Sequence, residues 1–329
     1  MSPPFVRESA PHVAPLDISP GAFAVGNRRV VVGTFSGWAI YDLPTLDLLA
    51  SNAHALLSES VVIGVQWHGA DVLMLAQQPG KTKELLALDQ AHTLRALHTL
   101  PSGDWQMVRH VSGPRSYLYD VTEGVGVVSY DRRGQCWRVA MPDVRKVMAA
   151  ASQLLCLGRG RLIVLDDDGR VALNAALPDT CTWTAATRMP DGSLLLGGHD
   201  KRTHDYALAT LDRHGKLAGA VAQHPLASVF TAKTIRMAFA DRECGLDLFH
   251  VARMYATGAR TLVVALGGGG DALGASQGAA ALAVVTLGER VQWQSCVIDT
   301  EDGISGFAPL ADGRWLADLC GELRVYGPG

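Results

Sequence analysis

The densest group of ionisable side chains in this chain lies between residues 199 and 205, where the sequence reads HDKRTHD. Two histidines five residues apart, each followed by a carboxylate, supply nitrogen and oxygen atoms that divalent metal ions bind. Imidazole also titrates near neutral pH, so the same residues suit a general acid and base. A solvated hairpin loop has a similar composition, and that interpretation is favoured. The members of the group are His199, Asp200, Lys201, Arg202, His204 and Asp205.

The elements that must position this loop are β-strands, and they recur in a regular pattern. Each repeat has an apolar strand that ends in Asp, a turn of two or three residues, and a second apolar strand. The first five repeats are separated by 47, 42, 35 and 46 residues, which matches the length of one four-stranded propeller blade. The pattern occurs at Asp42, Asp89, Asp131, Asp166 and Asp212, and more loosely around Gly288.

Strand patterns fall into seven groups of this length, and Asp-Gly turns between apolar runs indicate tight hairpins within them. The sequence therefore predicts an all-β, seven-bladed β-propeller of four-stranded antiparallel blades, with eight blades as the alternative. The groups are expected near residues 22–50, 61–99, 104–139, 144–176, 182–222, 246–297 and 304–326.

The two ends of the chain predict how the fold is closed. The last group has only three strand patterns, and the apolar residues 13–18 (VAPLDI) precede the first group without a partner in it. We expect residues 13–18 to form the outer strand of the last blade, after a flexible N-terminus at 1–12. Closure by an N-terminal strand removes exposed sheet edges.

One interval breaks the rhythm of the repeat. The turn at Leu287 follows Asp212 only after 75 residues, which is longer than one blade. The excess predicts two insertions in the sixth blade, at residues 223–245 and 267–278, of which the second is Gly-rich and typical of a loop. The whole chain, residues 1–329, is expected to form a single domain.

With its repeats laid out, the chain resembles the seven-bladed β-propeller superfamily, and its pattern is similar to that of quinoprotein-like and YVTN-like propellers. The Gly-His and Trp-Asp marks of WD40 repeats are missing, as are the double glycines of kelch blades and the YWTD motif of receptor propellers. The Trp docking signature of quinoprotein repeats is missing too. The resemblance therefore implies a fold without a cofactor or a functional residue.

Composition excludes several classes of protein. The net charge of −3 argues against a broad nucleic-acid surface, which needs a dense positive stripe, and the pair Arg28-Arg29 is interpreted as a solvated turn. No membrane span or signal peptide is predicted, and the six cysteines form no CxxC pair, which fits a reducing compartment. We expect a soluble, cytoplasmic, monomeric protein, and the Ala-, Gly- and Leu-rich composition indicates a bacterial one.

Turn lengths point to one face of the predicted propeller. The connections between the second and third strands of a blade, and between blades, are long and varied, and such loops commonly carry function. We expect this loop-rich face to bind a protein partner without catalysis. A sharper form of this hypothesis is an immunity or adaptor protein, an antitoxin, that caps a toxin or another secreted effector. The candidate binding residues are Lys81, Lys83, His199, Asp200, Lys201, Arg202, His204, Asp205, Arg236 and Asp271.

An enzyme is the alternative. A lactonase-, epimerase- or lyase-like propeller, with or without a metal ion, needs polar residues from several first strands directed at one point. Few of the candidates are carboxylates, and neither GxSxG nor HExxH occurs, so no catalytic residue and no metal ligand is assigned. The first-strand candidates are Gln66, His68, Gln106, Arg109, Thr184, Arg188 and His250.

Overall fold

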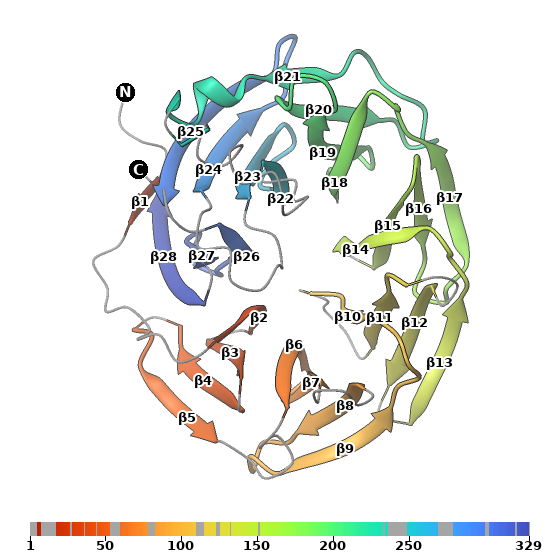
Figure 1. Cartoon of the computed structure of the whole chain (residues 1–329), viewed down its shortest axis with the longest axis vertical. Coiled ribbons are helices and arrows are strands. Elements are labelled where there is room, and N and C mark those ends of the chain that lie inside the picture. The colour runs from red at the N-terminus through yellow and green to blue at the C-terminus, as the bar shows by residue number, and fades with distance from the viewer. Residues whose placement is uncertain are drawn as a thin grey trace. The chain divides into compact units, whose positions relative to one another are not determined.

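The structure is a computed structural model in which seven four-stranded antiparallel sheets form the blades of a β-propeller (Figure 1). None of the helices among the residues it describes is long and apolar enough to cross a membrane. The chain divides into two compact units, one made of residues 10–159 and 163–172 and the other of residues 1–9, 160–162 and 173–329. The described residues are 5–7, 18–26, 28–35, 37–43, 45–52, 60–77, 83–109, 115–122, 126–131, 133–150, 152–232, 234–235, 249–268, 279–299, 303–319 and 321–328.

The first unit holds blades 1 to 3 and most of the strands of blade 4. In these blades the strands lie side by side in chain order and are called A to D. Blade 1 is β2 (Ile18–Val25), β3 (Arg29–Thr34), β4 (Trp38–Asp42) and β5 (Leu48–Asn52); blade 2 is β6 (Val61–His68), β7 (Asp71–Gln77), β8 (Lys83–Leu88) and β9 (Leu94–Thr99). Blade 3 is β10 (Trp105–Met107), β11 (Ser116–Asp120), β12 (Gly126–Asp131) and β13 (Gly134–Val139); blade 4 is β14 (Val144–Ala150), β15 (Gln153–Gly158), β16 (Arg161–Leu165) and β17 (Val171–Ala176).

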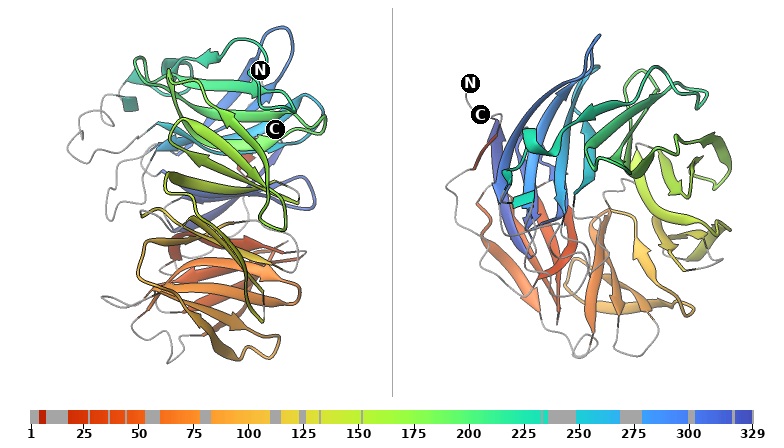
Figure 2. Two further views of the ribbon diagram at one scale, coloured as in Figure 1. Left: turned by 90° about the vertical axis from the view of Figure 1, so that its right-hand side faces the viewer. Right: turned by 45° about the horizontal axis from the view of Figure 1, so that its top comes forward.

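The second unit holds blades 5 to 7, and Figure 2 shows the twist of the sheets from two further directions. Blade 5 is β18 (Cys181–Arg188), β19 (Leu194–Asp200), β20 (Tyr206–Leu211) and β21 (Ala222–His224), followed by the short 3-10 helix η2 (Leu226–Ser228). Blade 6 is β22 (His250–Ala256), β23 (Thr261–Gly268), β24 (Ala279–Thr286) and β25 (Gln292–Asp299); blade 7 is β26 (Ile304–Pro309), β27 (Trp315–Leu319), β28 (Glu322–Pro328) and β1 (Phe5–Arg7).

Seven blades of four strands confirm the predicted fold class. The structure has long connections between β21 and β22 and between β23 and β24, and the predicted insertions at 223–245 and 267–278 stay predictions. Most of the first insertion, from residue 236 on, and the core of the second, residues 269–278, lie outside the described residues. The expectation of one domain for residues 1–329 stays a prediction.

The outer strand of blade 7 differs from the prediction. The strand that pairs with β28 is β1, in which Phe5 lies opposite Pro328 and Arg7 opposite Tyr326. Residues 13–17 lie outside the described part of the chain, and Ile18 pairs with Thr34 as the first residue of β2. An N-terminal strand does complete the last blade, but it consists of residues 5–7, and Ile18, the last residue of the predicted closing strand, belongs to β2 of blade 1.

The Asp of the sequence repeat terminates strand C of its blade and closes the C–D turn. The Asp212 carboxylate accepts hydrogen bonds from the backbone N–H groups of His214 and Lys216, each at 2.9 Å. Asp166 accepts equivalent bonds from Asp168 and Arg170, at 3.0 and 2.8 Å. Short carboxylate side chains form such turns because they satisfy backbone donors that the strands leave unpaired. This local chemistry explains why Asp, rather than another polar residue, recurs at the end of strand C in blades 1 to 5.

The apolar core lies in the inner strands of each blade. The middle of β7 is buried on both faces, whereas β9, the outermost strand of the same blade, is exposed at half of its residues. Because consecutive strands are antiparallel, the A–B and C–D turns leave a blade at one end, called the turn end. The B–C and D–A connections leave at the opposite end, called the loop end. These two ends present different residues, and the candidate sites divide between them.

Candidate functional site

The 199–205 loop joins β19 to β20 at the loop end of blade 5, and backbone hydrogen bonds fix its conformation. The Asp200 N–H donates to the Asp205 carbonyl at 2.9 Å, and the His204 N–H donates to the Asp200 carbonyl at 2.9 Å. His204 has a φ of +62°, a left-handed conformation that a non-glycine residue seldom adopts. The sequence cluster is therefore a tight, ordered turn.

Both carboxylates of this loop hold the backbone together. One oxygen of Asp200 accepts from the Thr203 and Arg202 N–H groups at 2.9 and 2.8 Å, and the other accepts from Gln223 Nε2 at 2.9 Å. The N–H bonds of Thr203 and then Arg202 lower the pKa of Asp200. A carboxylate stabilised in this way is a weak base. The bonds thus oppose the general-base role that the sequence left open.

Asp205 connects the loop to the next segment of the same blade end. Its Oδ1 accepts a hydrogen bond from the Leu226 N–H at 3.1 Å, so the B–C loop is joined to η2 in the connection that leads toward β22. The loop end of blade 5 is thus built from two segments that are 21 residues apart in the sequence. The prediction that B–C and D–A connections share one end is confirmed for this blade.

The two histidines of the loop are packed against each other. The His199 side chain is buried with 3% exposure, and its ring centroid lies 6.1 Å from that of His204 with 26° between the ring planes. Within the described ranges, no three His, Cys, Asp or Glu side chains come together as a metal-ion site. The stacked pair is better explained as packing beneath the loop than as a pair of ligands.

The cations of the loop are its exposed part. The Lys201 ammonium donates to the Asp179 carbonyl at 2.5 Å, which holds its aliphatic chain along the start of the blade. The Arg202 side chain is exposed, and its guanidinium has no hydrogen-bond or ion-pair partner among the described residues. Arg202 is therefore the group of this loop that is available to a binding partner.

The other predicted binding residues belong to the other unit or lie outside the described residues. Lys83 begins β8 in the other unit and is buried with 5% exposure, and its ammonium donates to Asp104 Oδ1 at 2.8 Å and to the Trp105 carbonyl at 2.9 Å. Lys83 thus connects blades 2 and 3, and the expectation that it contacts a partner is not supported by this geometry. Lys81, Arg236 and Asp271 lie outside the described residues.

Three of the A-strand candidates for a catalytic site make side-chain hydrogen bonds within the fold. Gln66 Nε2 donates to the Arg115 carbonyl at 3.0 Å, and Thr184 Oγ1 donates to the Val251 carbonyl at 2.8 Å. Gln106 Oε1 accepts from the Tyr119 hydroxyl at 2.7 Å. These contacts connect strands and blades, so they give these three residues a structural role, whereas the buried Arg188 Nε has no hydrogen-bond partner among the described residues.

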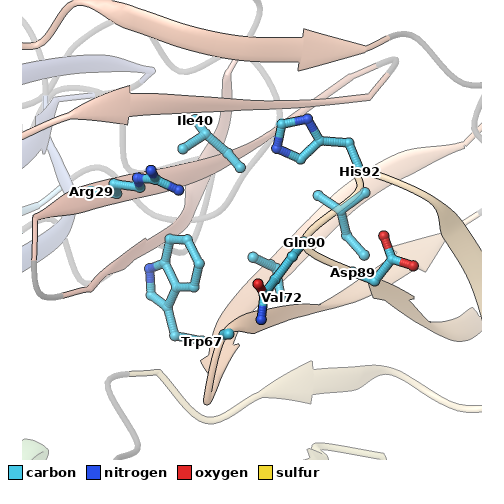
Figure 3. Close-up of a pocket in the computed structure, with 9 residues that line it drawn as sticks. Arg29, Ile40, Trp67, Val72, Asp89, Gln90 and His92 are labelled. Carbon is cyan, nitrogen blue, oxygen red and sulfur yellow. The ribbon is translucent and has the colours of Figure 1, made fainter.

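Sequence reasoning missed a pocket at the turn end of blades 1 and 2, which has a volume of about 290 Å³ (Figure 3). Ile40 and Val72 belong to its apolar part, and in Figure 3 Arg29 and His92 lie on opposite sides of it. The one signal in the sequence was the pair Arg28-Arg29, which composition alone assigns to a solvated turn. The full lining is Arg29, Ile40, Trp67, Ala70, Val72, Leu88, Asp89, Gln90 and His92.

Fold and site together define a β-propeller whose polar clusters mainly support its own turns. The sequence matches no protein-family model and no curated protein. Solved structures share the fold at low identity. A streptogramin B lyase structure has a TM-score of 0.62 at 10% identity, and the match covers 99% of this chain and 97% of that one.

Two further similar structures contain protein or peptide assemblies by their descriptions. YCF48 bound to D1 peptide has a TM-score of 0.66 at 10% identity, with 99% of this chain and 96% of that chain covered. A chain of the mitotic checkpoint complex has a TM-score of 0.65 at 11% identity, with 98% and 93% covered. At this level of identity the likeness establishes the seven-bladed fold alone.

Proposed function

We propose that this protein is a non-enzymatic binding propeller that holds a protein partner at the loop end of blade 5. The observation that carries the proposal is the hydrogen-bonded 199–205 loop, which presents the exposed Arg202 on a fixed backbone. A loop that is already ordered loses little conformational entropy on binding. Arginine is also enriched at the energetic centres of protein interfaces.

The similar structures support this proposal by example. YCF48 is described with a bound D1 peptide, and another similar chain belongs to the mitotic checkpoint complex. The lyase among the similar structures shows that the fold also serves enzymes. For this chain, however, the loop carboxylates Asp200 and Asp205 both accept backbone hydrogen bonds, which favours binding over acid–base chemistry.

The sharper form of the proposal is that the protein acts in a bacterial cytoplasm as an immunity or adaptor protein, and that the partner is a toxin or another secreted effector. It is the form that the sequence composition suggests, and its test is the identity of the captured partner. The gene next to this one would encode that partner. Co-expression of both products, followed by purification through this chain, should then yield a stable complex.

The binding face is tested with matched variants of blade 5. The double variant Lys201→Ala, Arg202→Ala should reduce capture of the partner from native lysate at least about tenfold, the change expected when charge-assisted contacts are lost. The control is Arg213→Ala, which removes an exposed arginine from the turn end of the same blade. Melting temperatures should be the same for all three proteins. Equal capture by the double variant and the wild type would remove this face from the proposal.

A further inference from the structure

The pocket between blades 1 and 2 has an apolar wall built from one row of cross-strand neighbours. Trp67 on β6 lies opposite Val72 on β7, and Val72 lies opposite Leu88 on β8. Ile40 on β4 of blade 1 lines the pocket as well. Ile40, Val72 and Leu88 belong to one buried cluster, and Trp67 packs against it. The pocket is therefore the solvent-facing end of the core between these two blades.

The indole of Trp67 is held in a fixed position. Its Nε1 donates a hydrogen bond to the Ala24 carbonyl at 3.0 Å, across the interface between blades 2 and 1. A Cβ on Gly26 would lie 2.9 Å from the same Nε1, so the absence of a side chain at residue 26 allows the indole to reach this place. A wall that is fixed in advance favours binding, because no rearrangement has to precede it.

Some polar side chains around the pocket are hydrogen-bonded within the protein, and others are not. The Asp89 carboxylate is engaged, because its Oδ1 accepts the Thr93 N–H at 2.8 Å and closes the C–D turn. Within the described residues, the exposed side chains of Arg29 and Gln90 have no hydrogen-bond or ion-pair partner. The adjacent Arg28 is also exposed, and its side chain has no such partner in the described part of the chain. The groups that line the pocket without a hydrogen bond among the described residues thus include a guanidinium, an amide and the imidazole of His92, which contacts the Trp38 ring, and the Arg28 cation is adjacent.

The size and charge of the pocket together define its occupant. Pockets that enclose a drug-sized ligand have volumes of about 300–1,000 Å³, and at about 290 Å³ this one falls just below that range. It therefore suits one side chain of a larger ligand. An unpaired guanidinium binds carboxylates through two parallel hydrogen bonds. A carboxamide such as that of Gln90 can donate to one backbone group and accept from another.

We propose that this pocket binds a short acidic segment of a protein that inserts one large apolar side chain between Ile40 and Trp67 and places a carboxylate at Arg29. Gln90 pairs with the backbone of the inserted residue. This site is at the turn end of blades 1 and 2, so it is a second contact site beyond the proposed function of blade 5, and it stands or fails independently of that function.

The test uses fluorescein-labelled peptides of the form Asp-Glu-X-Glu-Asp, with X as Leu, Ile, Phe, Trp or Ala, and fluorescence anisotropy as the readout. The large apolar members should bind the wild-type protein at least about tenfold more tightly than the Ala member, because burial of a large side chain supplies most of the affinity. The same peptides with Asn and Gln in place of Asp and Glu should bind about tenfold more weakly.

Two variants locate the binding. Arg29→Gln should weaken the binding of the acidic peptides about tenfold, and Ala70→Trp, which places a large ring at an exposed lining residue, should abolish it. The matched control is Arg95→Gln on β9, which removes an exposed arginine of blade 2 away from the pocket and should change nothing. Unchanged melting temperatures establish that all variants fold.

Three results would overturn the proposal. One is equal binding of the Ala member and the large apolar members. Another is equal binding by the wild type, Arg29→Gln and Ala70→Trp. The third is binding of free 3-phenylpropionate as tight as that of the Phe peptide, because the site would then be one for small carboxylates. Unchanged partner capture by the Lys201→Ala, Arg202→Ala variant, together with intact peptide binding, would contradict the proposed function only.

Discussion

The Lys83 ammonium lies 2.8 Å from the Asp104 carboxylate, although the lysine side chain is 5% exposed and the aspartate side chain 52%. The same ammonium donates to the Trp105 carbonyl at 2.9 Å, so one cation connects the start of β8 to the segment that opens blade 3. A buried cation needs such partners, because the loss of hydration would otherwise be uncompensated. The contact between blades 2 and 3 therefore depends on a polar group as well as on apolar packing.

Substitution of Lys83 by Met should test this contact. Met preserves most of the apolar stem but leaves the Trp105 carbonyl without its partner, and a buried unsatisfied group costs about 1–3 kcal/mol. We expect the free energy of unfolding to fall by about this amount in urea titrations. Lys216→Met, at an exposed lysine in a C–D turn, is the control and should be within about 0.5 kcal/mol of the wild type. A Lys83→Met protein as stable as the control would show that the buried contact contributes nothing.

Asp212 should make the protein sensitive to acid. Hydrogen bonds from the Lys216 N–H, and also from the His214 N–H, lower the pKa of Asp212 in the folded state. In the unfolded chain the pKa of an Asp side chain is about 3.9. The charged carboxylate therefore stabilises the fold fully above that pH, and this stabilisation is lost as the pH falls below it toward the folded-state pKa. Asp212→Asn keeps an oxygen acceptor without the charge. Its melting temperature should be below that of the wild type at pH 7, and the difference should shrink by pH 3.

The control for the acid titration is Glu289→Gln. The Glu289 side chain is exposed in the C–D turn of blade 6, and its carboxylate has no hydrogen-bond or ion-pair partner among the described residues. We expect the difference between Glu289→Gln and the wild type to stay small at every pH. A difference for Asp212→Asn that is constant from pH 7 to pH 3 would contradict the electrostatic explanation.

Gly169 and Gly160 offer a comparison of two left-handed glycines. Their φ angles are +77° and +73°, but an added Cβ at Gly169 would lie 2.7 Å from Trp137 Cδ2, whereas none of the described atoms lies within 4 Å at Gly160. The Trp137 ring cannot easily retreat, because its Nε1 donates to the Asp167 carbonyl at 2.8 Å. Gly169→Ala should therefore lower the free energy of unfolding by about 1–3 kcal/mol more than Gly160→Ala in denaturant titrations. Equal losses would mean that backbone strain alone acts at both sites.

Phe5 should anchor β1 to the last blade. It is 6% exposed and belongs to the same apolar cluster as Phe307 and Trp315. Phe5→Ala should cost about 3 kcal/mol of unfolding free energy, the low end for a core Phe, since β1 is only three residues long. Phe35→Ala, at a phenylalanine that is 49% exposed, is the control and should be close to neutral in the same urea titration. If both variants are equally stable, β1 contributes little to the fold.

The fold was predictable because its signal is local. Each Asp turn depends on a carboxylate and backbone donors within four residues, as Asp166 and Asp212 show. The position of the closing strand was not predictable in this way. Phe5, Val6 and Arg7 are too short a segment to show a strand period, and their partners Pro328, Gly327 and Tyr326 are at the other end of the sequence.

The candidate site was predictable only in part. The residues of the 199–205 loop are neighbours in the sequence, so their grouping was visible, but the hydrogen bonds that engage Asp200 were not. The pocket combines Arg29 and Ile40 of one blade with Trp67 and His92 of the next. Packing between blades decides which of these side chains meet, and no periodicity in the sequence reports it.

The pairing of β1 with β28 has a consequence for the order in which the sheets fold. Six of the seven sheets contain strands that are consecutive in the chain, so each can form from its own local hairpins. In the seventh sheet only β26, β27 and β28 are consecutive, and the fourth strand, β1, pairs Phe5 with Pro328 from a distant part of the sequence. The loop-closure entropy of that long-range contact has to be overcome before β1 adds to the sheet. We therefore expect β1 to join its blade after the local hairpins of the seven sheets have formed.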